Sequence, residues 1–456
     1  MFHLIEIEGT QRCVPPPPTG SVQPAPEDWN VRIPQTIRLD FLCLEKGSIV
    51  NDARTHSLIY SSGLGISASI AALFALVSCG GSNESATQNS ATLEQGKQTF
   101  RYETFGDEVK WTDTLRMHEV VAAAVDPTTA LSVGLKVDAD ALPQAVVDGI
   151  KNGTVDLKSP ATTVALLKLD AVVGLKGTVE NVNGTDTLTH LGITCALCHS
   201  TVDDSFAPGI GKRLDGWPNR DLNPGAIIAL SPAIDASQKA LLNAWGKGKF
   251  DPRGNVDGLS KAVVIPPAYG LDGIHRITVT GDGDQIAYWN RYVSVVEMGG
   301  LGSFSEPRLN LTVVHGTTDL VSDKLPALQA YQLSIAAPPP PAGSFDSAAA
   351  MRGQLVFDGP GKCATCHSGS TFTDANIRLH PPSDSMAEPE VPSYASRSAT
   401  KQYRTSPLRG VWQHPPYFHD GSAPTLDAVV QTYNARLSLG LSAAQMADLA
   451  QYLKSL

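Results

Sequence analysis

The pentapeptide Cys195-Ala196-Leu197-Cys198-His199 recurs, with one change, as Cys363-Ala364-Thr365-Cys366-His367. In a CxxCH motif, two thiols on one short turn can bond to the vinyl groups of a haem, and the adjacent histidine binds the iron. A zinc site or a redox dithiol is the alternative. It fits less well, because zinc-binding pairs lie closer together and a redox CxxC occurs once, after a strand. The sequence therefore predicts two covalently bound c-type haems.

The other cysteines are consistent with this prediction. Four of the seven belong to the two motifs, which leaves Cys13, Cys43 and Cys79. Cys79 falls at the end of an export signal described below, and Cys13 and Cys43 lie upstream of it. A processed chain would therefore contain neither a free thiol nor a disulfide.

Composition limits the class of protein. The 456 residues include 40 glycines and 32 prolines, and only 18% are charged, which indicates long loops. The formal net charge of −10 argues against a nucleic-acid-binding surface. Helical spacing of apolar residues occurs at 141–153, 161–175, 348–357 and 442–456, and no segment requires a strand-rich fold. We expect a mostly α protein with two cytochrome c-like haem domains and long loops.

The N-terminal region resembles an export signal. Residues 63–78 are apolar, follow Arg54 and end in small side chains, and they are too short for a comfortable transmembrane helix. Leu76-Val77-Ser78-Cys79 resembles the lipobox of bacterial lipoproteins, in which the cysteine is lipidated. An ordinary cleaved signal with an incidental cysteine is the alternative. Both imply export, and the first predicts a periplasmic protein anchored to the membrane through Cys79.

Composition also suggests domain boundaries. The proline-rich stretch at 336–343 is extended and stiff, so it separates two folded regions. The complete prediction is a doubtful or disordered extension (1–53), a lipoprotein-type signal (54–79), a tether (80–92), a first haem domain (93–335), the linker (336–343) and a second haem domain (344–456).

The C-terminal region resembles the bacterial di-haem cytochrome c peroxidase family, which includes MauG-like enzymes. The resemblance rests on TSPLR at 405–409, PYFHDG at 416–421 and TLDAVV at 425–430. It is specific at the second haem and faint in most of the first domain. It implies a reactive first haem, at which peroxide is reduced, and a second haem that passes electrons. It also implies a small electron-donor protein, such as a cytochrome c or a cupredoxin.

The resemblance assigns roles at the second haem. Tyr433 stands at the position of the second axial ligand, where peroxidases carry methionine and MauG-like enzymes carry tyrosine. An anionic phenolate ligand lowers the reduction potential, whereas a thioether raises it. Alternatively, Tyr433 is an ordinary helix aromatic and the iron takes His414, His419 or no second ligand. His419 would otherwise form hydrogen bonds beside the haem, and Arg409 would pair with a haem propionate.

At the first haem the resemblance points to Glu297. The stretch 294–299, SVVEMG, is similar to the distal segment in which a glutamate moves protons for peroxide cleavage. A solvated glutamate on a helix is the alternative. No histidine occurs between His199 and His275. The first iron would therefore be open, unless His275 or Met298 reaches it.

The sequence also departs from the family. The tryptophan that lies between the haems is missing at 281–283, so Trp289 or Trp412 would have to replace it as an electron relay. The segment 264–267 lacks the side-chain oxygen that binds calcium in the family, so the sequence does not support a calcium site. Two other functions stay open: an electron carrier with two six-coordinate haems, and a di-haem oxygenase resembling the bacterial rubber-cleaving enzymes.

Overall fold

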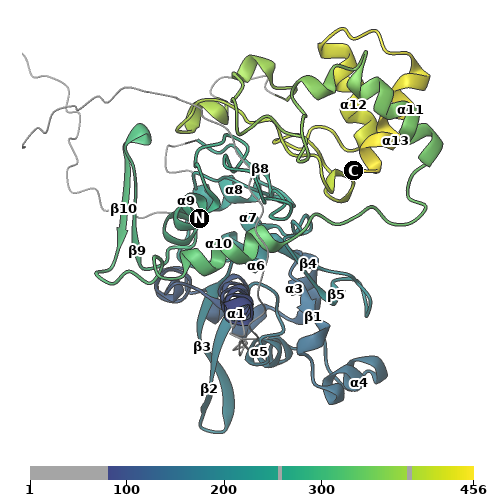
Figure 1. Ribbon diagram of the computed structural model, residues 1–456. Helices are drawn as coiled ribbons and strands as arrows, with labels where there is room; N and C mark the ends of the chain where they lie inside the picture. Colours follow the sequence, from purple (N-terminus) through teal and green to yellow (C-terminus); the bar gives the residue numbers. More distant parts are fainter. Residues whose placement is uncertain (1–80, 255–258, 388–392) are drawn as a thin grey trace, which may run out of the picture. The chain divides into compact units, whose positions relative to one another are not determined.

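A computed structural model describes residues 81–254, 259–387 and 393–456 (Figure 1). The expected extension (1–53), the signal segment (54–79) and Cys79 lie outside the described residues. Among the residues that are described, no helix is long and apolar enough to cross a membrane.

The described chain is helix-rich, as the sequence predicts, with short two-stranded sheets between the helices. The α-helices are α1 (Gly81–Tyr102), α2 (Met117–Ala124), α3 (Pro127–Ser132), α4 (Gln144–Asn152), α5 (Pro160–Lys168), α6 (Ala196–His199), α7 (Pro224–Ala229), α8 (Ala236–Asn243), α9 (Ile286–Tyr292), α10 (Leu325–Ser334), α11 (Ser347–Asp358), α12 (Leu426–Arg436) and α13 (Ala443–Lys454). Two π-helices are η1 (Val109–Thr114) and η3 (Val293–Glu297).

The strands are β1 (Val137–Asp138), β2 (Leu175–Val182), β3 (Thr185–Ile193), β4 (Ser200–Val202), β5 (Ile210–Gly211), β6 (Arg213–Asp215), β7 (Lys249–Phe250), β8 (Val263–Val264), β9 (Gly302–Glu306) and β10 (Leu311–His315). The pairs β2–β3 and β9–β10 are antiparallel hairpins. They contradict the expectation that strands are unnecessary. The β2–β3 hairpin turns at Asn183-Gly184, where both residues have positive φ, as a type I′ hairpin turn requires.

Helix α1 corrects a second expectation. It extends back to Gly81 and covers nearly all of the segment 80–92, which is predicted from the sequence to be a tether. The stretch contains alanine, glutamine and glutamate, which favour helix. By contrast, residues 336–343 contain neither a helix nor a strand, and the helices expected at 348–357 and 442–456 are present as α11 and α13.

One helix crossing is built around Gly96 in α1. A Cβ atom at this position would lie 2.0 Å from the carbonyl oxygen of Ala327 in α10, so only glycine allows the two helices to approach this closely. One turn further along α1, Phe100 contacts Tyr331 of α10 with ring centroids 5.7 Å apart. Figure 1 shows α1 and α10 crossing.

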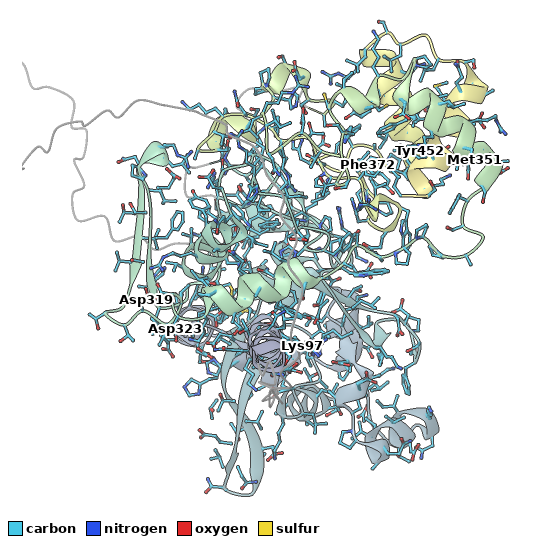
Figure 2. All side chains as sticks on the ribbon, in the orientation of Figure 1. Lys97, Asp319, Asp323, Met351, Phe372 and Tyr452 are labelled. Carbon is cyan, nitrogen blue, oxygen red and sulfur yellow. The ribbon has the colours of Figure 1, made fainter. Side chains whose placement is uncertain are left out.

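The same crossing occurs again between α11 and α13. A Cβ atom at Gly353 would lie 2.0 Å from the carbonyl oxygen of Asp448, and Phe357 contacts Tyr452 with ring centroids 5.2 Å apart. Phe372 packs on the same Phe357 ring at 6.1 Å; Tyr452 and Phe372 are labelled in Figure 2. In both regions, a helix that precedes the CxxCH motif thus crosses a later helix at a glycine, and a phenylalanine one turn further along contacts a tyrosine of that helix.

A loop is also repeated. At 276–292 and at 416–432, a bridged turn leads into a helix, with the bridges Ile277–Gly283 and Tyr417–Ala423 in matching places. Each copy accepts a hydrogen bond from the segment that precedes the other copy. The Val264 N–H donates to the His419 carbonyl, and the Arg404 N–H donates to the Val279 carbonyl, both at 2.8 Å. The regions 93–335 and 344–456, called the first and second halves below, thus share a construction that low sequence similarity conceals.

The crossing at Gly353 gives a stability prediction. In an exposed helix, Gly→Ala stabilises by about 1 kcal/mol. Here we expect Gly353→Ala to lower the free energy of unfolding by about 1–3 kcal/mol, because the new methyl group meets the Asp448 carbonyl. Chemical denaturation measures the change. Met351→Ala is the control, since Met351 lies on the same helix with 67% exposure (Figure 2). Stabilisation by Gly353→Ala would contradict the close crossing.

Candidate haem sites

The first CxxCH motif, residues 195–199, lies where β3 ends and the short helix α6 begins. Cys195 and Cys198 are half-buried free thiols. The Nδ1 atom of His199 lies 3.1 Å from the carbonyl oxygen of Pro266. Burial lowers the pKa of His199 to about 4, so the ring is neutral, as a metal ligand must be.

The second motif, residues 363–367, follows α11 as a single 3₁₀ turn. Its cysteines are also free and half-buried. The Nδ1 atom of His367 lies 3.1 Å from the carbonyl oxygen of Phe372, and burial lowers the pKa of this imidazole as well.

Both motifs present a donor set that fits a covalently attached haem. Each histidine can donate its Nδ1–H to a backbone carbonyl, which fixes the ring and leaves Nε2 for iron. Neither pair of cysteines forms a disulfide, so both thiols of each pair are available to bond to vinyl groups.

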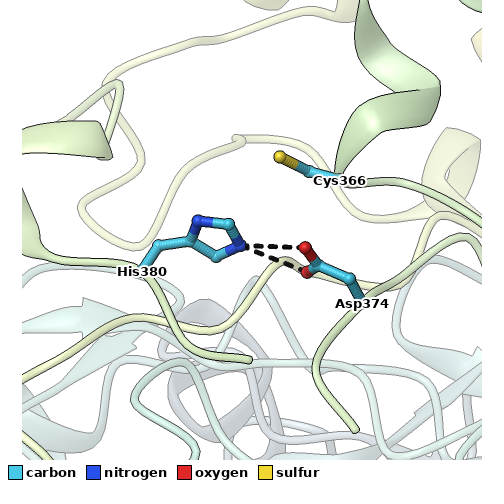
Figure 3. Close-up of side chains that lie close together, drawn as sticks. All are labelled: Cys366, Asp374 and His380. Atoms are coloured by element: carbon cyan, nitrogen blue, oxygen red, sulfur yellow. Dashed lines mark hydrogen bonds and ion pairs between the residues drawn. The ribbon is translucent and has the colours of Figure 1, made fainter. Parts of the chain in front are cut away.

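The alternative of a cation site is weakened by the partners of Asp374. The side chains of Cys366, Asp374 and His380 lie close together (Figure 3). Asp374, however, accepts from His380 at 3.1 Å and from Arg378 at 2.6 Å. The carboxylate is thus already occupied, and the adjacent guanidinium would repel a metal cation. We interpret these residues as an ion-paired cluster beside the motif.

Tyr433 lies beside the second motif. Its ring packs near Phe418, with centroids 6.2 Å apart. Its pKa is raised to about 12, by burial and then by the charges of Cys363 and Cys366, so the hydroxyl and these thiols are neighbours. The structure therefore places Tyr433 near the second motif, and its role as an iron ligand stays a prediction.

The first half has no equivalent of this tyrosine. Helices α9 and α12 begin at matching positions of the repeated loop, which places Val293 where the second half has Tyr433. A valine side chain has no atom that can bind a metal.

Arg409 and His419, both expected beside the second haem, have different neighbours in the structure. Arg409 is exposed, donates from Nε to the Ser370 carbonyl at 2.5 Å, and lies over the Phe372 ring. His419 stacks between Tyr403 and Tyr394, with ring centroids 4.9 Å and 6.2 Å away.

The two candidate electron relays, Trp289 and Trp412, make different contacts in the structure. Trp289 stacks on Tyr292 within the first half, at 4.6 Å. Trp412 of the second half meets Trp217 of the first half edge to face, at 5.9 Å. Of the two, Trp412 is therefore the one that joins the halves.

Glu297 lies at the end of the π-helix η3 and is 7% exposed. Its Oε1 atom is buried without a hydrogen-bond partner. Burial raises the pKa of Glu297 to about 8, against the positive charges of Arg253 and Lys110. The pKa of the Cys198 thiol is raised by its own burial and then by the charge of Glu297, which places Glu297 near the first motif. The alternative of a solvated helix glutamate is therefore wrong.

Two neighbouring residues of the other π-helix, η1, hold the backbone at Glu297. Lys110 Nζ donates to the Glu297 carbonyl, and Trp111 Nε1 donates to the Met298 carbonyl, both at 3.0 Å. π-Helices are rare in proteins, and those that do occur are often found at functional sites. Sequence reasoning missed Lys110 and Trp111, because VKWTDT has no spacing that predicts a π-turn.

A buried ionic network adjoins Glu297. Arg253 donates to Asp282 at 2.9 Å, and Arg397 donates to Asp251 at 3.0 Å, with all four side chains at most 6% exposed. Arg253 Nε also donates to the Arg397 carbonyl. The network joins loops of both halves. Nothing in the sequence indicated the pairing of Asp282 with Arg253, because the two residues are 29 positions apart.

Comparisons with known proteins support one part of the assignment. Residues 402–439 match the family described as RoxA-like, cytochrome c-like. This segment is cytochrome c-like. It contains the PYFHDG sequence and Tyr433, and the match supports c-type haem in the second half.

Solved structures give distant likenesses. Hydrazine synthase of Kuenenia stuttgartiensis, pressurised with 20 bar xenon, has a TM-score of 0.30 and 20% identity over 46% of this chain and 74% of its own. A MauG-like protein associated with microbial copper homeostasis has a TM-score of 0.29 and 19% identity over 42% of this chain and 73% of its own. Both likenesses are too distant to carry further conclusions. No curated protein matches the chain.

Proposed function

We propose that this protein is an exported di-haem oxidoreductase of the peroxidase or MauG-like type, which reduces peroxide at the first motif with electrons relayed through the second. The observation that carries the proposal is the buried carboxyl group of Glu297. Its Oε1 atom has no hydrogen-bond partner within the described structure, and the pKa of the Cys198 thiol is raised by burial and then by the charge of Glu297. An unsatisfied buried carboxyl group is costly, and such groups cluster at catalytic sites.

The two halves would have different roles, with peroxide reduction in the first half and electron transfer in the second. A haem at the first motif would supply an open iron position, since Val293 offers no ligand there. Glu297 would accept a proton from one peroxide oxygen at Oε1 and return it to the departing oxygen. Lys110 and Trp111 fix the backbone of Glu297 and Met298, so the carboxyl group is held in place. Two electrons and two protons per peroxide would yield two waters.

The second half would hold the electron-transfer haem, with His367 and Tyr433 as candidate ligands. We propose that a small electron-donor protein, such as a cytochrome c or a cupredoxin, delivers electrons there. We also propose the domain limits 93–335 and 344–456, joined by 336–343, and a periplasmic location with a lipid anchor at Cys79. The resemblance to the di-haem peroxidases supports these assignments.

Steady-state reduction of peroxide by the purified protein and a reduced donor tests the function. We expect peroxide-dependent oxidation of the donor, and cyanide binding at one haem that inhibits it. Two haems that bind neither cyanide nor peroxide would indicate an electron carrier. Stable dioxygen binding after reduction, without peroxide turnover, would indicate an oxygenase.

Tyr433 gives a prediction for the second haem. We expect Tyr433→Met to raise the reduction potential of this haem by a substantial part of the roughly 0.8 V that axial ligands span, because a thioether would replace an anionic phenolate. Spectroelectrochemical titration measures the potential. Tyr433→Phe keeps the ring and removes the ligand atom, so it should abolish the tyrosinate spectrum. Unchanged spectra and potentials in both variants would exclude Tyr433 as a ligand.

A further inference from the structure

Arg220 is a partly buried cation for which no ion pair is found among the described residues. Its Nε and Nη1 atoms are inaccessible to solvent and have no hydrogen-bond partner. Burial lowers its pKa to about 10, and the tyrosines Tyr269 and Tyr417 oppose this effect. An unpaired buried charge costs several kcal/mol, so such groups are normally paired with an anion.

Three other arginines with buried side chains show the usual arrangement. Each donates to an aspartate at 3.0 Å or less: Arg213 to Asp138, Arg253 to Asp282, and Arg397 to Asp251. Among the described residues, Arg220 differs from these three because no carboxylate pairs with it. Within that part of the chain, Arg404 also has an unsatisfied Nε and no such pair, but its Nη1 donates to the Arg276 carbonyl at 2.9 Å.

The surroundings of Arg220 come from both halves. His414 of the second half lies between Tyr269 and Tyr417, with ring centroids 6.5 Å and 5.8 Å away. Its Nδ1 atom is also buried without a partner, and the ring stays neutral because burial and the charge of Arg220 lower its pKa to about 3. Arg220 and His414 thus bring unsatisfied polar atoms to one place.

The segment before Arg220 is attached to the first motif. The Gly216 N–H donates to the His199 carbonyl at 2.8 Å, and the Asn219 N–H donates to the Cys198 carbonyl at 2.9 Å. A group bonded to the cysteines of this motif would therefore be held at a fixed position relative to Arg220.

We propose that Arg220, assisted by His414, forms a carboxylate-binding site, and that its occupant is a propionate of the haem attached to Cys195 and Cys198. A guanidinium binds a carboxylate through two parallel hydrogen bonds, which suits this ligand. The inference depends on the proposed haem at the first motif. It adds a contact through which the second half, by His414 and Tyr417, acts on that haem.

The charge of Arg220 would then affect the haem potential. A positive charge beside the propionate disfavours the ferric state, which is one unit more positive than the ferrous state. We expect Arg220→Gln to lower the reduction potential of the first haem, because no positive charge would then offset the negative charge of the propionate. The effect does not require any change in peroxide chemistry.

Spectroelectrochemical titration of the haem-loaded protein at pH 8 tests the site. At a fixed electrode potential, Arg220→Gln should raise the ferric-to-ferrous ratio of the first haem by about tenfold, the equivalent of about 59 mV. Arg220→Lys should restore part of the difference, and His414→Gln should shift the same haem less. Arg116→Gln is the matched control, because it removes an arginine that is 51% exposed and should change nothing.

Unchanged reduction potentials in Arg220→Gln and His414→Gln at full haem content would overturn the proposal. So would a change in the potential of the second haem alone, or a failure of Arg220→Lys to restore any part of the potential. A change in potential seen only with added phosphate or acetate would also overturn it, because the ligand would then be a free anion. Pyridine haemochrome analysis separates this inference from the proposed function. Fewer than two haems per chain would contradict the function itself, whereas two haems with an unaffected first potential would contradict only the Arg220 site.

Discussion

The Glu297→Gln variant is expected to reduce peroxide at least about 100-fold more slowly than the unchanged protein, at equal haem content. The substitution keeps the size of the buried side chain but removes the group that accepts and returns the proton. Steady-state turnover measures the loss. Glu180→Gln on strand β2 is the control, because this glutamate is exposed, and it should have no effect. Unchanged turnover in Glu297→Gln would remove Glu297 from the mechanism.

The same residue should set the pH dependence. Burial raises the pKa of Glu297 to about 8, so the carboxyl group is mostly protonated at neutral pH. Proton acceptance requires the carboxylate, so kcat/KM for peroxide should increase with pH and level off above about 8. Glu297→Gln should lose this dependence.

The raised pKa has an opposite effect on stability: the folded protein binds the proton more tightly than the unfolded chain, so this group contributes less stability as pH rises from about 4.5 to about 8.

Arg253→Met is expected to lower the free energy of unfolding by about 3–5 kcal/mol. The variant leaves Asp282, whose side chain is 1% exposed, without the guanidinium that neutralises it. Urea denaturation measures the change. Arg291→Met is the control, because Arg291 and Asp319 form a more exposed pair whose loss should cost less than about 1 kcal/mol. A loss below about 1 kcal/mol in Arg253→Met would show that the network does not hold the loops together.

The sequence was informative where the chemistry is local. A CxxCH motif carries its thiols and its histidine within five residues, and the helices α11 and α13 have regular apolar spacing, so both could be predicted. The PYFHDG segment identified the region that the family comparison also matches. Tyr433 was predicted from its position downstream of that segment, and the structure places it near Cys363 and Cys366.

Long-range partners could not be predicted in this way. Arg397 pairs with Asp251, and Lys110 holds the backbone at Glu297, across long separations in the chain that no spacing rule connects. The repeated loop was also hidden, because its turn is conserved in backbone shape, with positive φ at Thr278 and Phe418, while the side chains differ. The choice between Trp289 and Trp412 likewise needed the contact with Trp217.

The measurement that tests the central proposal most directly is the low-temperature EPR spectrum of the ferric protein, with and without peroxide. The proposed division of work predicts one high-spin haem, open at the first motif, and one low-spin haem, ligated at the second. The high-spin signal should disappear when peroxide is added. Two low-spin signals that do not respond to peroxide would contradict the proposal and indicate an electron carrier.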